Sequence, residues 1–380
     1  MTNIIDNNID KRFFLDSGDT LSFSKPSSQC HGSAIDRRQF LNYTGSLAAA
    51  VLFSNLFSCV SSQLKPLKNE NILKGVLIID AHAHPEKMCR GPESPSIKDM
   101  QYIGMEASSF AAVGDLSYIK RQKFSEYKRT FGQFYRNPQK LVKHGKIEPV
   151  LFAEDIPNSL GPSDPPGAIF AIEGGDCLEG KPENVDAFYY HGVRMITVVH
   201  RRNNEIGDSM NPMTREYWNG GLTTAGRKII ERMQELGMMV DVAHAHKKTL
   251  KQIAEISAAP LIDSHTNPGS GHRQRSWEEM EQVAKTGGII CTWPQAFPKR
   301  STFQSWAEEI FKMKQRLGIE HVALGTDGGG LIDCELIHGY KNIRELPYLA
   351  TSMQKIGLTT EDISAYMGGN FYRIFKQCVG

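Results

Sequence analysis

The stretch "VLIIDAHAH", residues 76–84, decides the fold because its pattern recurs along the chain. A short apolar run is followed by an acid and two histidines, so polar side chains gather where an expected strand ends. From residue 73 onward, seven more apolar runs alternate with helical patterns. Most are continuously apolar, as expected of parallel strands covered on both faces. They are "FAAVG" (110–114), "AIFAIEGG" (168–175), "RMITVVH" (194–200), "MMVDVAHA" (238–245), "PLIDSH" (260–265), "GIICTW" (288–293) and "HVALGTD" (321–327).

The segments between these runs have the features of helices. "TTAGRKIIERMQELG" (223–237) places its large apolar residues on one stripe and ends at a glycine. Ser276 with Glu279, and Ser305 with Glu308, have the spacing of capping boxes, so we expect helices to begin there. Eight strand–helix units predict an α/β fold of the (β/α)₈ TIM-barrel type.

The first sixty residues differ from the rest. Residues 1–35 are polar, and "DRRQFLNYTGSLAAAVLFSNLFSC" (36–59) combines Arg37 and Arg38 with an apolar stretch too short to span a bilayer. This pattern predicts a twin-arginine export signal, and Cys59 ends a loose lipoprotein box. We therefore expect a tail and signal over 1–62, a linker over 63–75, and one domain over 76–380. Export would place the protein in the periplasm or cell envelope, with a membrane tether if Cys59 is lipidated.

Composition excludes several classes of function. The formal net charge is +2 and no lysine- or arginine-rich run occurs, so we expect no nucleic-acid partner. The seven cysteines include no C-x-x-C pair, which argues against a zinc knuckle, a redox motif or a disulfide framework. The oligomeric state is left open between a monomer and a homodimer.

Polar residues fall at the carboxyl ends of six expected strands. In a barrel these ends meet at one mouth, where barrel enzymes carry their chemistry. Taken singly, each has an ordinary explanation, because a lone histidine is more often a hydrogen-bonded core residue than a ligand. Seven such coincidences favour one shared site. Its members are His82, His84, Glu173, His200, His244, His265 and Asp327.

Imidazoles and carboxylates without thiolates suit zinc or a similar divalent ion in a catalytic role. The set exceeds what one ion needs, so we expect two ions about 3.5–4 Å apart, bridged by a carboxylate. Bound metal lowers the pKa of water to near 7 and so supplies a nucleophile at neutral pH. Asp327, on the last expected strand, is the candidate for the base.

At this point the chain resembles the membrane (renal) dipeptidases of the amidohydrolase superfamily. The resemblance covers about residues 76–376. It rests on "FAIEGG", "ITVVHRRNNEIGDS", "GLTTAGRKIIERMQELGMMVDVAHA", "APLIDSHTNP", "HVALGTDGGG" and "GLTTEDISAYMGGNFYRIF" in this order. It implies a metal-dependent hydrolase that cleaves short peptides, among them dipeptides with D-residues.

The resemblance also implies roles for single residues. His82 and His84 would bind the first metal, Glu173 would bridge, and His244 and His265 would bind the second. His200 would contact the oxygen of the scissile carbonyl and stabilise the tetrahedral intermediate, while Asp327 would carry the proton. An arginine after the last histidine would hold the substrate carboxylate. "GHRQRSWEEM" offers Arg273 and Arg275, and we favour Arg275 because it directly precedes a helix.

Two departures from the family pattern concern the first metal and the pocket. The family's first motif ends in Asp where this chain has His84, so the site carries one negative charge fewer. Residues 85–150 diverge from the family, and loops there would line the substrate pocket. Two alternatives stay open: another amidohydrolase-type reaction, on a lactone, amide or phosphoester, or a non-catalytic metal-binding protein of the periplasm.

Overall fold

The computed structural model describes residues 72–380, except 90, 92, 121, 124, 211–219, 272 and 333. The predicted tail and export signal, including Arg37, Arg38 and Cys59, lie outside the described residues. The domain boundaries at 62 and 75 therefore stay predictions. Within the described part of the chain, no helix is long and apolar enough to cross a membrane.

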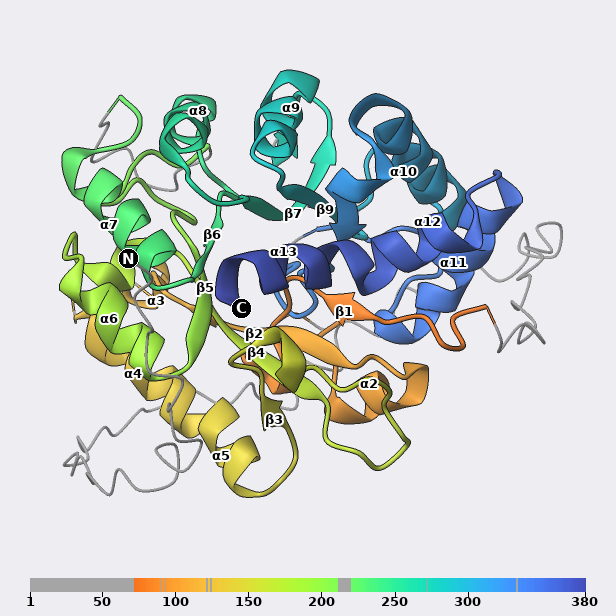
Figure 1. Ribbon diagram of the computed structural model, residues 1–380, viewed down its shortest axis with the longest axis horizontal. Coiled ribbons are helices and arrows are strands. Elements are labelled where there is room, and N and C mark those ends of the chain that lie inside the picture. Colours follow the sequence, from red (N-terminus) through yellow and green to blue (C-terminus); the bar gives the residue numbers. More distant parts are fainter. Residues whose placement is uncertain are drawn as a thin grey trace, which may run out of the picture. The chain divides into compact units, whose positions relative to one another are not determined.

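Eight parallel strands form a nearly closed barrel, seen end-on in Figure 1. Neighbouring strands pair in the order β1-β2-β4-β5-β6-β7-β9-β10. Backbone hydrogen bonds between the end of β1 and the end of β10 complete the ring. Ala81 N donates to Leu324 O at 3.1 Å, and Asp327 N donates to His82 O at 2.8 Å. All eight predicted strands and the predicted (β/α)₈ fold are thus confirmed. The strands are β1 Ile79–Asp80, β2 Ala107–Val113, β4 Gly167–Glu173, β5 Val193–Thr197, β6 Met239–Asp241, β7 Ile262–Pro268, β9 Ile289–Thr292 and β10 Val322–Leu324.

Two short strands lie off this ring. β3 (Glu148–Pro149) pairs with β4, and β8 (Gln274–Arg275) pairs with the end of β7. β8 bears on the site, because the two arginines that the sequence offers for the substrate carboxylate lie in it (Arg275) and directly before it (Arg273).

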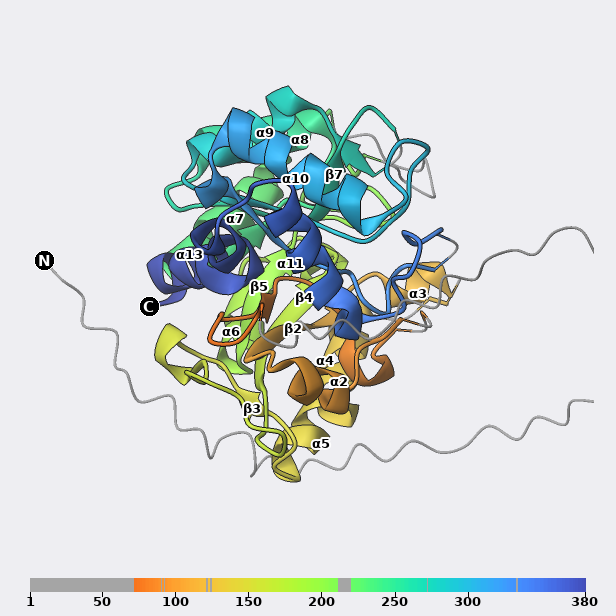
Figure 2. The same cartoon turned by 90° about the vertical axis from the view of Figure 1, so that its right-hand side faces the viewer.

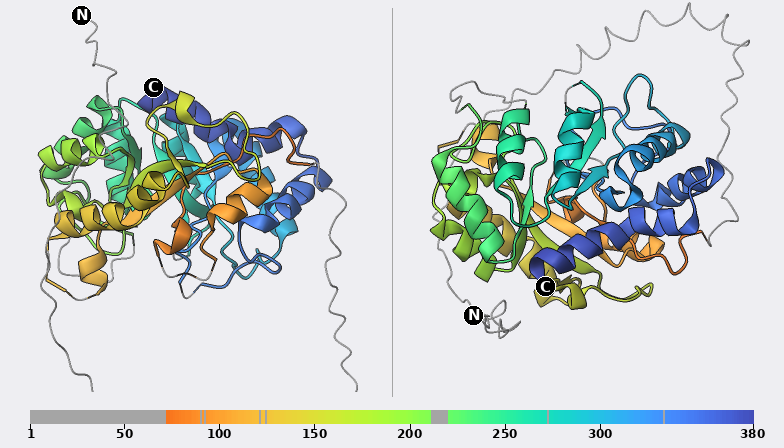
Figure 3. Two further views of the ribbon diagram at one scale, coloured as in Figure 1. Left: turned by 90° about the horizontal axis from the view of Figure 1, so that it is seen from below. Right: turned by 45° about the horizontal axis from the view of Figure 1, so that its top comes forward.

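Helices surround the strands, as the views in Figure 2 and Figure 3 show. Their buried faces and the outward-facing strand residues make one large apolar layer. The divergent segment after β2 contributes three of them, α3, α4 and α5. The helices are α2 Ile97–Ile103, α3 Leu116–Ile119, α4 Glu126–Arg136, α5 Pro138–Lys143, α6 Glu183–Tyr190, α7 Thr224–Glu235, α8 Lys247–Ile256, α9 Trp277–Lys285, α10 Phe303–Leu317, α11 Leu346–Lys355, α12 Thr360–Ser364 and α13 Asn370–Val379.

The two predicted capping boxes have different outcomes. Ser276 caps α9 in a reciprocal box with Glu279, as predicted. The box predicted at Ser305 and Glu308 is wrong, because α10 begins earlier. Thr302 caps it and Ser305 is the third helical residue, so Ser305 closes a box with Thr302 instead.

The inside of the barrel is filled from one end by α13, which lies across the strands in Figure 1. Phe371, Ile374 and Phe375 are fully buried there. They join a second apolar cluster with residues at the starts of several strands, among them Ile79 and Ala107. Because strand starts lie at the end opposite the strand carboxyl ends, α13 closes the bottom and leaves the mouth free.

Candidate metal centre

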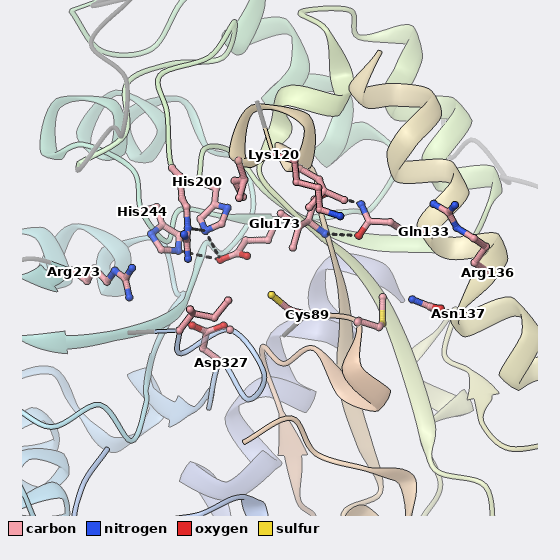
Figure 4. Close-up of a pocket in the computed structure, with 17 residues that line it drawn as sticks. Cys89, Lys120, Gln133, Arg136, Asn137, Glu173, His200, His244, Arg273 and Asp327 are labelled. Carbon is pink, nitrogen blue, oxygen red and sulfur yellow. Dashed lines mark hydrogen bonds and ion pairs between the residues drawn. The ribbon is translucent and has the colours of Figure 1, made fainter. Parts of the chain in front are cut away.

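The seven predicted side chains lie together at the mouth of the barrel. The backbone brings them there because six of them follow or end a strand, and His265 lies within β7, and the apolar residues of these strands are fixed in the core. Figure 4 shows His200, His244, Glu173 and Asp327 converging on one cavity. Six of the seven are buried and His244 is only slightly more exposed. Such a concentration of buried polar groups requires partners.

The first group consists of His82, His84, Glu173 and Asp327. His84 Nε2 lies 3.5 Å from Glu173 Oε2 and 3.4 Å from Asp327 Oδ1, and His82 Nε2 lies 3.8 Å and 3.9 Å from the same two side chains. Among the described residues, His82 Nε2, His84 Nε2 and Asp327 Oδ1 are buried without a hydrogen-bond partner. Three such atoms aimed at one point are what a cation site requires.

The second group consists of Glu173, His244 and His265. His244 Nε2 lies 3.1 Å from Glu173 Oε1 and 2.8 Å from His265 Nε2. Glu173 belongs to both groups, so its carboxylate can bridge two ions. The donor set, nitrogen and carboxylate oxygen in two groups with one shared acid, fits a pair of divalent metal ions.

Protonation states support this assignment at three of the four histidines. At His84, burial lowers the pKa but contacts with Asp327 and Glu173 raise it more, so the net shift is upward. Burial lowers the pKa of His82 to about 3 and that of His244 to about 4, and it lowers the pKa of His265 well below its usual value. These rings are therefore neutral at pH 7 and keep the lone pair that a metal needs. Burial would raise the pKa of Glu173, but the surrounding imidazoles hold it well below its usual range, so the bridge is ionised.

A hydrogen-bonded layer behind the ligands fixes the rings. His84 Nδ1 donates to Ala111 O at 2.8 Å, so Nε2 is the nitrogen left for a cation. Ser264 Oγ lies 2.9 Å from His265 Nδ1 and 3.3 Å from His82 Nδ1, and it donates to Asp241 Oδ2 at 2.7 Å. Such outer contacts orient metal ligands and tune their basicity.

The backbone is strained at two residues of the site. His244 and Asp327 have φ values of 62° and 51°, in the left-handed region that non-glycine residues rarely adopt. Both are tied down by backbone bonds, from Met210 N to His244 O (2.7 Å) and from Asp327 N to His82 O (2.8 Å). Strain of this kind, held by surrounding structure, is characteristic of functional sites.

His200 stands beside the second group. Its Nε2 lies 3.4 Å from Glu173 Oε1, and its Nδ1 lies 3.1 Å from Asp115 Oδ1. Burial lowers the pKa of His200, but the carboxylates of Glu173 and Asp115 raise it more, so the net shift is upward. The sequence analysis missed Asp115, although it follows the expected strand "FAAVG" just as the other site residues follow theirs.

A cavity of about 450 Å³ opens from the metal centre. Glu173, His200, His244 and Asp327 line one part of it, and aliphatic residues that include Val113, Leu116 and Ile332 line the wall. Figure 4 places Arg273 at one end and Arg136 with Asn137 at the other. The cavity is lined by four cationic side chains, Lys120, Arg136, Arg201 and Arg273, and by the acids Glu173 and Asp327.

The structure does not bring Arg275 to this cavity, which corrects the preference stated above. Arg275 is 1% exposed, and its guanidinium donates to Asp263 Oδ2 at 2.8 Å and to Val242 O at 2.6 Å. Another nitrogen contacts Ala245 O and Glu279. With its donors engaged inside the protein, Arg275 cannot hold a substrate in this position. Arg273 is the one of the two that lines the cavity.

Comparison with known proteins identifies the family of the chain. Residues 149–379 match the model of the family "Membrane dipeptidase (Peptidase family M19)". "Dipeptidase verJ" of Clonostachys rogersoniana is 29% identical over 213 residues, 54% of each chain, so this chain spans about half of that relative. "Uncharacterized dipeptidase C3A11.10c" of Schizosaccharomyces pombe is 28% identical over 294 residues, 72% of this chain and 68% of that one.

Solved structures share the fold. The probable dipeptidase PvdM from Pseudomonas aeruginosa superposes with a TM-score of 0.70 at 17% identity, over 81% of this chain and 97% of that one. A metallo peptidase from Rhodobacter sphaeroides gives 0.66 at 16% identity, over 80% and 99%. The family match begins after His82 and His84, yet the barrel carries both into the same centre. The chain belongs to the membrane dipeptidase family, peptidase family M19.

Proposed function

We propose that this protein is a metal-dependent dipeptidase. The observation that carries the proposal is the pair of residue groups that share Glu173. They lie at the mouth of the barrel and open into a cavity that Arg273 lines. The names of the family and of its relatives point to the same reaction. The cavity holds more cationic than acidic side chains, which favours a substrate that carries a carboxylate.

The metal would be held by His82, His84 and Glu173 on one side, with Asp327 beside them, and by Glu173, His244 and His265 on the other. We propose Zn²⁺, two per chain, because imidazole and carboxylate ligands without thiolate suit a catalytic zinc site. When bound, such ions polarise a carbonyl and lower the pKa of water to near 7.

The remaining steps belong to the chain's own residues. Asp327 would accept the proton released by the attacking water and return it to the leaving amine. His200 Nε2 faces the cavity beside Glu173, where it would contact the oxygen of the scissile carbonyl as negative charge develops. Arg273 would hold the C-terminal carboxylate through its planar fork. It has one contact in the described structure, from Nη1 to Cys334 Sγ at 3.0 Å, and thiol sulfur is a weak acceptor.

A metal-depletion experiment tests this function. Protein stripped with a chelator and reloaded with Zn²⁺ is assayed on a panel of L,L- and L,D-dipeptides, with matched lactones, simple amides and phosphoesters. We expect close to two ions per chain and turnover of dipeptides only after reloading. Full activity without metal contradicts the mechanism. Turnover of a lactone or phosphoester alone would move the protein to another amidohydrolase reaction, and binding without any turnover would make it a metal-binding protein.

We propose further that the protein is exported by a twin-arginine signal and tethered through Cys59. The support is the sequence of residues 36–59, which lies outside the described residues. Changing Arg37 and Arg38 together to Lys is expected to leave the precursor in the cytoplasm, as cell fractionation would show. Mass spectrometry of the mature N-terminus tests lipidation, and light scattering separates a monomer from a homodimer.

A further inference from the structure

Asp115 makes two contacts with the segment that follows β5 and carries His200. It lies two residues after the end of β2 and is 1% exposed. Its Oδ1 lies 3.1 Å from His200 Nδ1, and its Oδ2 accepts a hydrogen bond from Arg201 N at 3.2 Å. One carboxylate therefore holds the ring of His200 and the backbone that leads to Arg201. Both of these residues line the cavity.

Two glycines make this approach possible. A Cβ on Gly114 would lie 1.9 Å from the carbonyl oxygen of Gly174, so only glycine lets the ends of β2 and β4 come this close. Gly114 N donates to Glu173 O at 2.7 Å, which fixes the two ends together. Gly174 has a φ of 99°, and a Cβ there would lie 3.2 Å from His200 Cβ. The close packing of these three strand ends sets Asp115 against His200.

The contact between Asp115 and His200 Nδ1 determines which nitrogen of the imidazole faces the cavity. With Nδ1–H donated to Asp115, the other nitrogen, Nε2, lies at the cavity, 3.4 Å from Glu173 Oε1 and 3.4 Å from Arg201 Nε. Without the carboxylate, a half-turn of the ring could exchange the positions of the two nitrogens. The substrate oxygen would then meet the ring with Nε2 in the wrong place. Donation from Nε2 to that oxygen requires a proton on Nε2 as well as on Nδ1.

We propose that Asp115 is a positioning residue of the active site, which holds His200 with Nε2 toward the substrate. This inference rests on the proposed dipeptidase function for its kinetic readout only. Partners of this kind behind catalytic groups are worth about 10–100-fold in activity. Asp115 does not line the cavity and is not one of the residues grouped for metal binding, so its loss should leave metal content unchanged.

The test compares Asp115→Asn with Asp176→Asn. Asp176 is a matched control: it is 3% exposed, also follows a strand of this cluster, and pairs with Arg202 and Asn204 rather than with His200. In Asp115→Asn, the amide replaces one acceptor by a donor, so one of the two contacts is lost. We expect kcat to fall about 10–100-fold with a smaller change in KM. Metal content should stay full, and Asp176→Asn should keep kcat near that of the wild type.

A second readout does not depend on turnover. In protein labelled with ¹⁵N-histidine, the ring nitrogens of His200 are assigned by their loss in His200→Gln. We expect a hydrogen-bonded Nδ1–H signal in the wild type and in Asp176→Asn, and its loss or displacement in Asp115→Asn. An unchanged Nδ1 signal in Asp115→Asn overturns the inference, as does an equal loss of kcat in both variants. If the wild type cleaves no dipeptide, the proposed function fails and the NMR comparison still decides the role of Asp115.

Discussion

Glu173 gathers four imidazoles around a single carboxylate oxygen. The Nε2 atoms of His82, His200, His244 and His265 lie 3.8, 3.4, 3.1 and 3.6 Å from its Oε1. Burial alone would favour the neutral acid, yet the imidazoles keep the pKa of Glu173 well below its usual range. The residue is an ionised acceptor that several strands approach at once. That position suits a bridge between two cations and explains why its side chain sits at the centre of the site.

Asp327→Asn separates a proton carrier from a ligand. The amide keeps the shape of the side chain but cannot take up a proton, so we expect kcat to fall by about 10²–10⁴-fold. Metal content should stay nearly full, because His82, His84 and Glu173 remain on that side and Asn retains one carbonyl oxygen. His244→Ala should act in the opposite order and lose metal first. Both are measured by metal analysis and steady-state kinetics on the same preparation.

Asp327 Oδ1 lies 3.4 Å from His84 Nε2, so a direct part in metal binding is the competing outcome. If Asp327→Asn lost its metal while staying folded, Asp327 would be a required ligand and the base would have to be another group. If neither activity nor metal changed, the carboxylate would have no part in either, and Asp327 would serve only the turn in which its backbone carbonyl accepts from Gly330 N at 2.8 Å.

Replacing Arg273 and replacing Arg275 are expected to have different effects, the first on substrate binding and the second on stability. Arg273→Ala should raise KM for a free dipeptide far more than for its C-terminal amide, because only the free acid has a charge to lose. Arg275→Ala should instead lower the unfolding temperature, since it leaves Asp263 buried without its cation. Breaking a buried pair in this way costs about 3–5 kcal/mol. Kinetics on the free dipeptide and its amide, together with a thermal melt, distinguish the two variants. An equal rise in KM for both substrates in Arg273→Ala would mean that Arg273 does not bind the substrate carboxylate.

The two arginines also show where sequence reasoning at this scale ends. The strand-end positions of the histidines follow from the alternation of apolar runs, so their convergence could be predicted. The choice between Arg273 and Arg275 depends on local backbone geometry. Arg273 has a φ of 63°, and β8 pairs with the end of β7, which turns the side chain of Arg275 into the protein. Nothing in the spacing of "GHRQRSW" indicates that turn.

At the scale of elements, a residue that caps one helix also contacts another helix that is distant in sequence. Asp362 lies in α12, where it closes a capping box with Thr359 and accepts from Thr359 N at 2.8 Å. The same carboxylate meets Lys314 Nζ of α10 at 2.6 Å. One side chain thus both begins α12 and ties it to the neighbouring helix. The cap of α10 was not predicted from the sequence. The T-x-x-S pattern at Thr302 caps this helix, whereas the more familiar S-x-x-E pattern that begins three residues later does not.

Asp362→Asn is expected to destabilise the protein in a pH-dependent way. Burial raises the pKa of Asp362, but Lys314 and Thr359 lower it more, so the folded value lies below the unfolded value of 3.8. A lowered pKa means that the stabilisation is present above about pH 4 and is lost as the pH falls through the folded pKa. At pH 7 we expect a loss of about 1 kcal/mol, the usual value for a cap, from denaturant unfolding.

The loss should shrink when the same titration is repeated near pH 3, where the wild-type carboxyl begins to protonate. Glu255→Gln is the matched control. Its ion pair with Lys251 spans 4.0 Å between side chains that are 60% and 61% exposed, so little free energy depends on it. A loss in Asp362→Asn that is the same at both pH values would contradict the charge-based explanation and leave only the hydrogen bonds.

Across the whole molecule, chemistry and stability are placed at opposite ends of one barrel. The strand carboxyl ends carry the candidate metal centre, where buried polar atoms and positive φ values cost stability. The strand starts are covered by α13, where Phe371 and Phe375 stack with ring centroids 5.8 Å apart. The barrel itself could be predicted from eight apolar runs. Its closure by the C-terminal helix could not, because amphipathic helices of a barrel have the same pattern whether they lie outside it or across its end.

Phe375→Ala tests whether stability and activity depend on opposite ends of the barrel. Phe375 is fully buried in the cluster that fills the bottom of the barrel, so its truncation should cost about 3–5 kcal/mol of unfolding free energy. Because the cavity is lined by residues at the other end, kcat and metal content of the folded fraction should stay near those of the wild type. Lys376→Ala, on the exposed face of the same helix, should change neither stability nor activity.

Denaturant unfolding measures the loss of stability, and kinetics at a temperature well below the melting point measure kcat. A large fall in kcat for folded Phe375→Ala would mean that the bottom of the barrel positions the metal ligands, and the two ends would have to be treated as one cooperative unit.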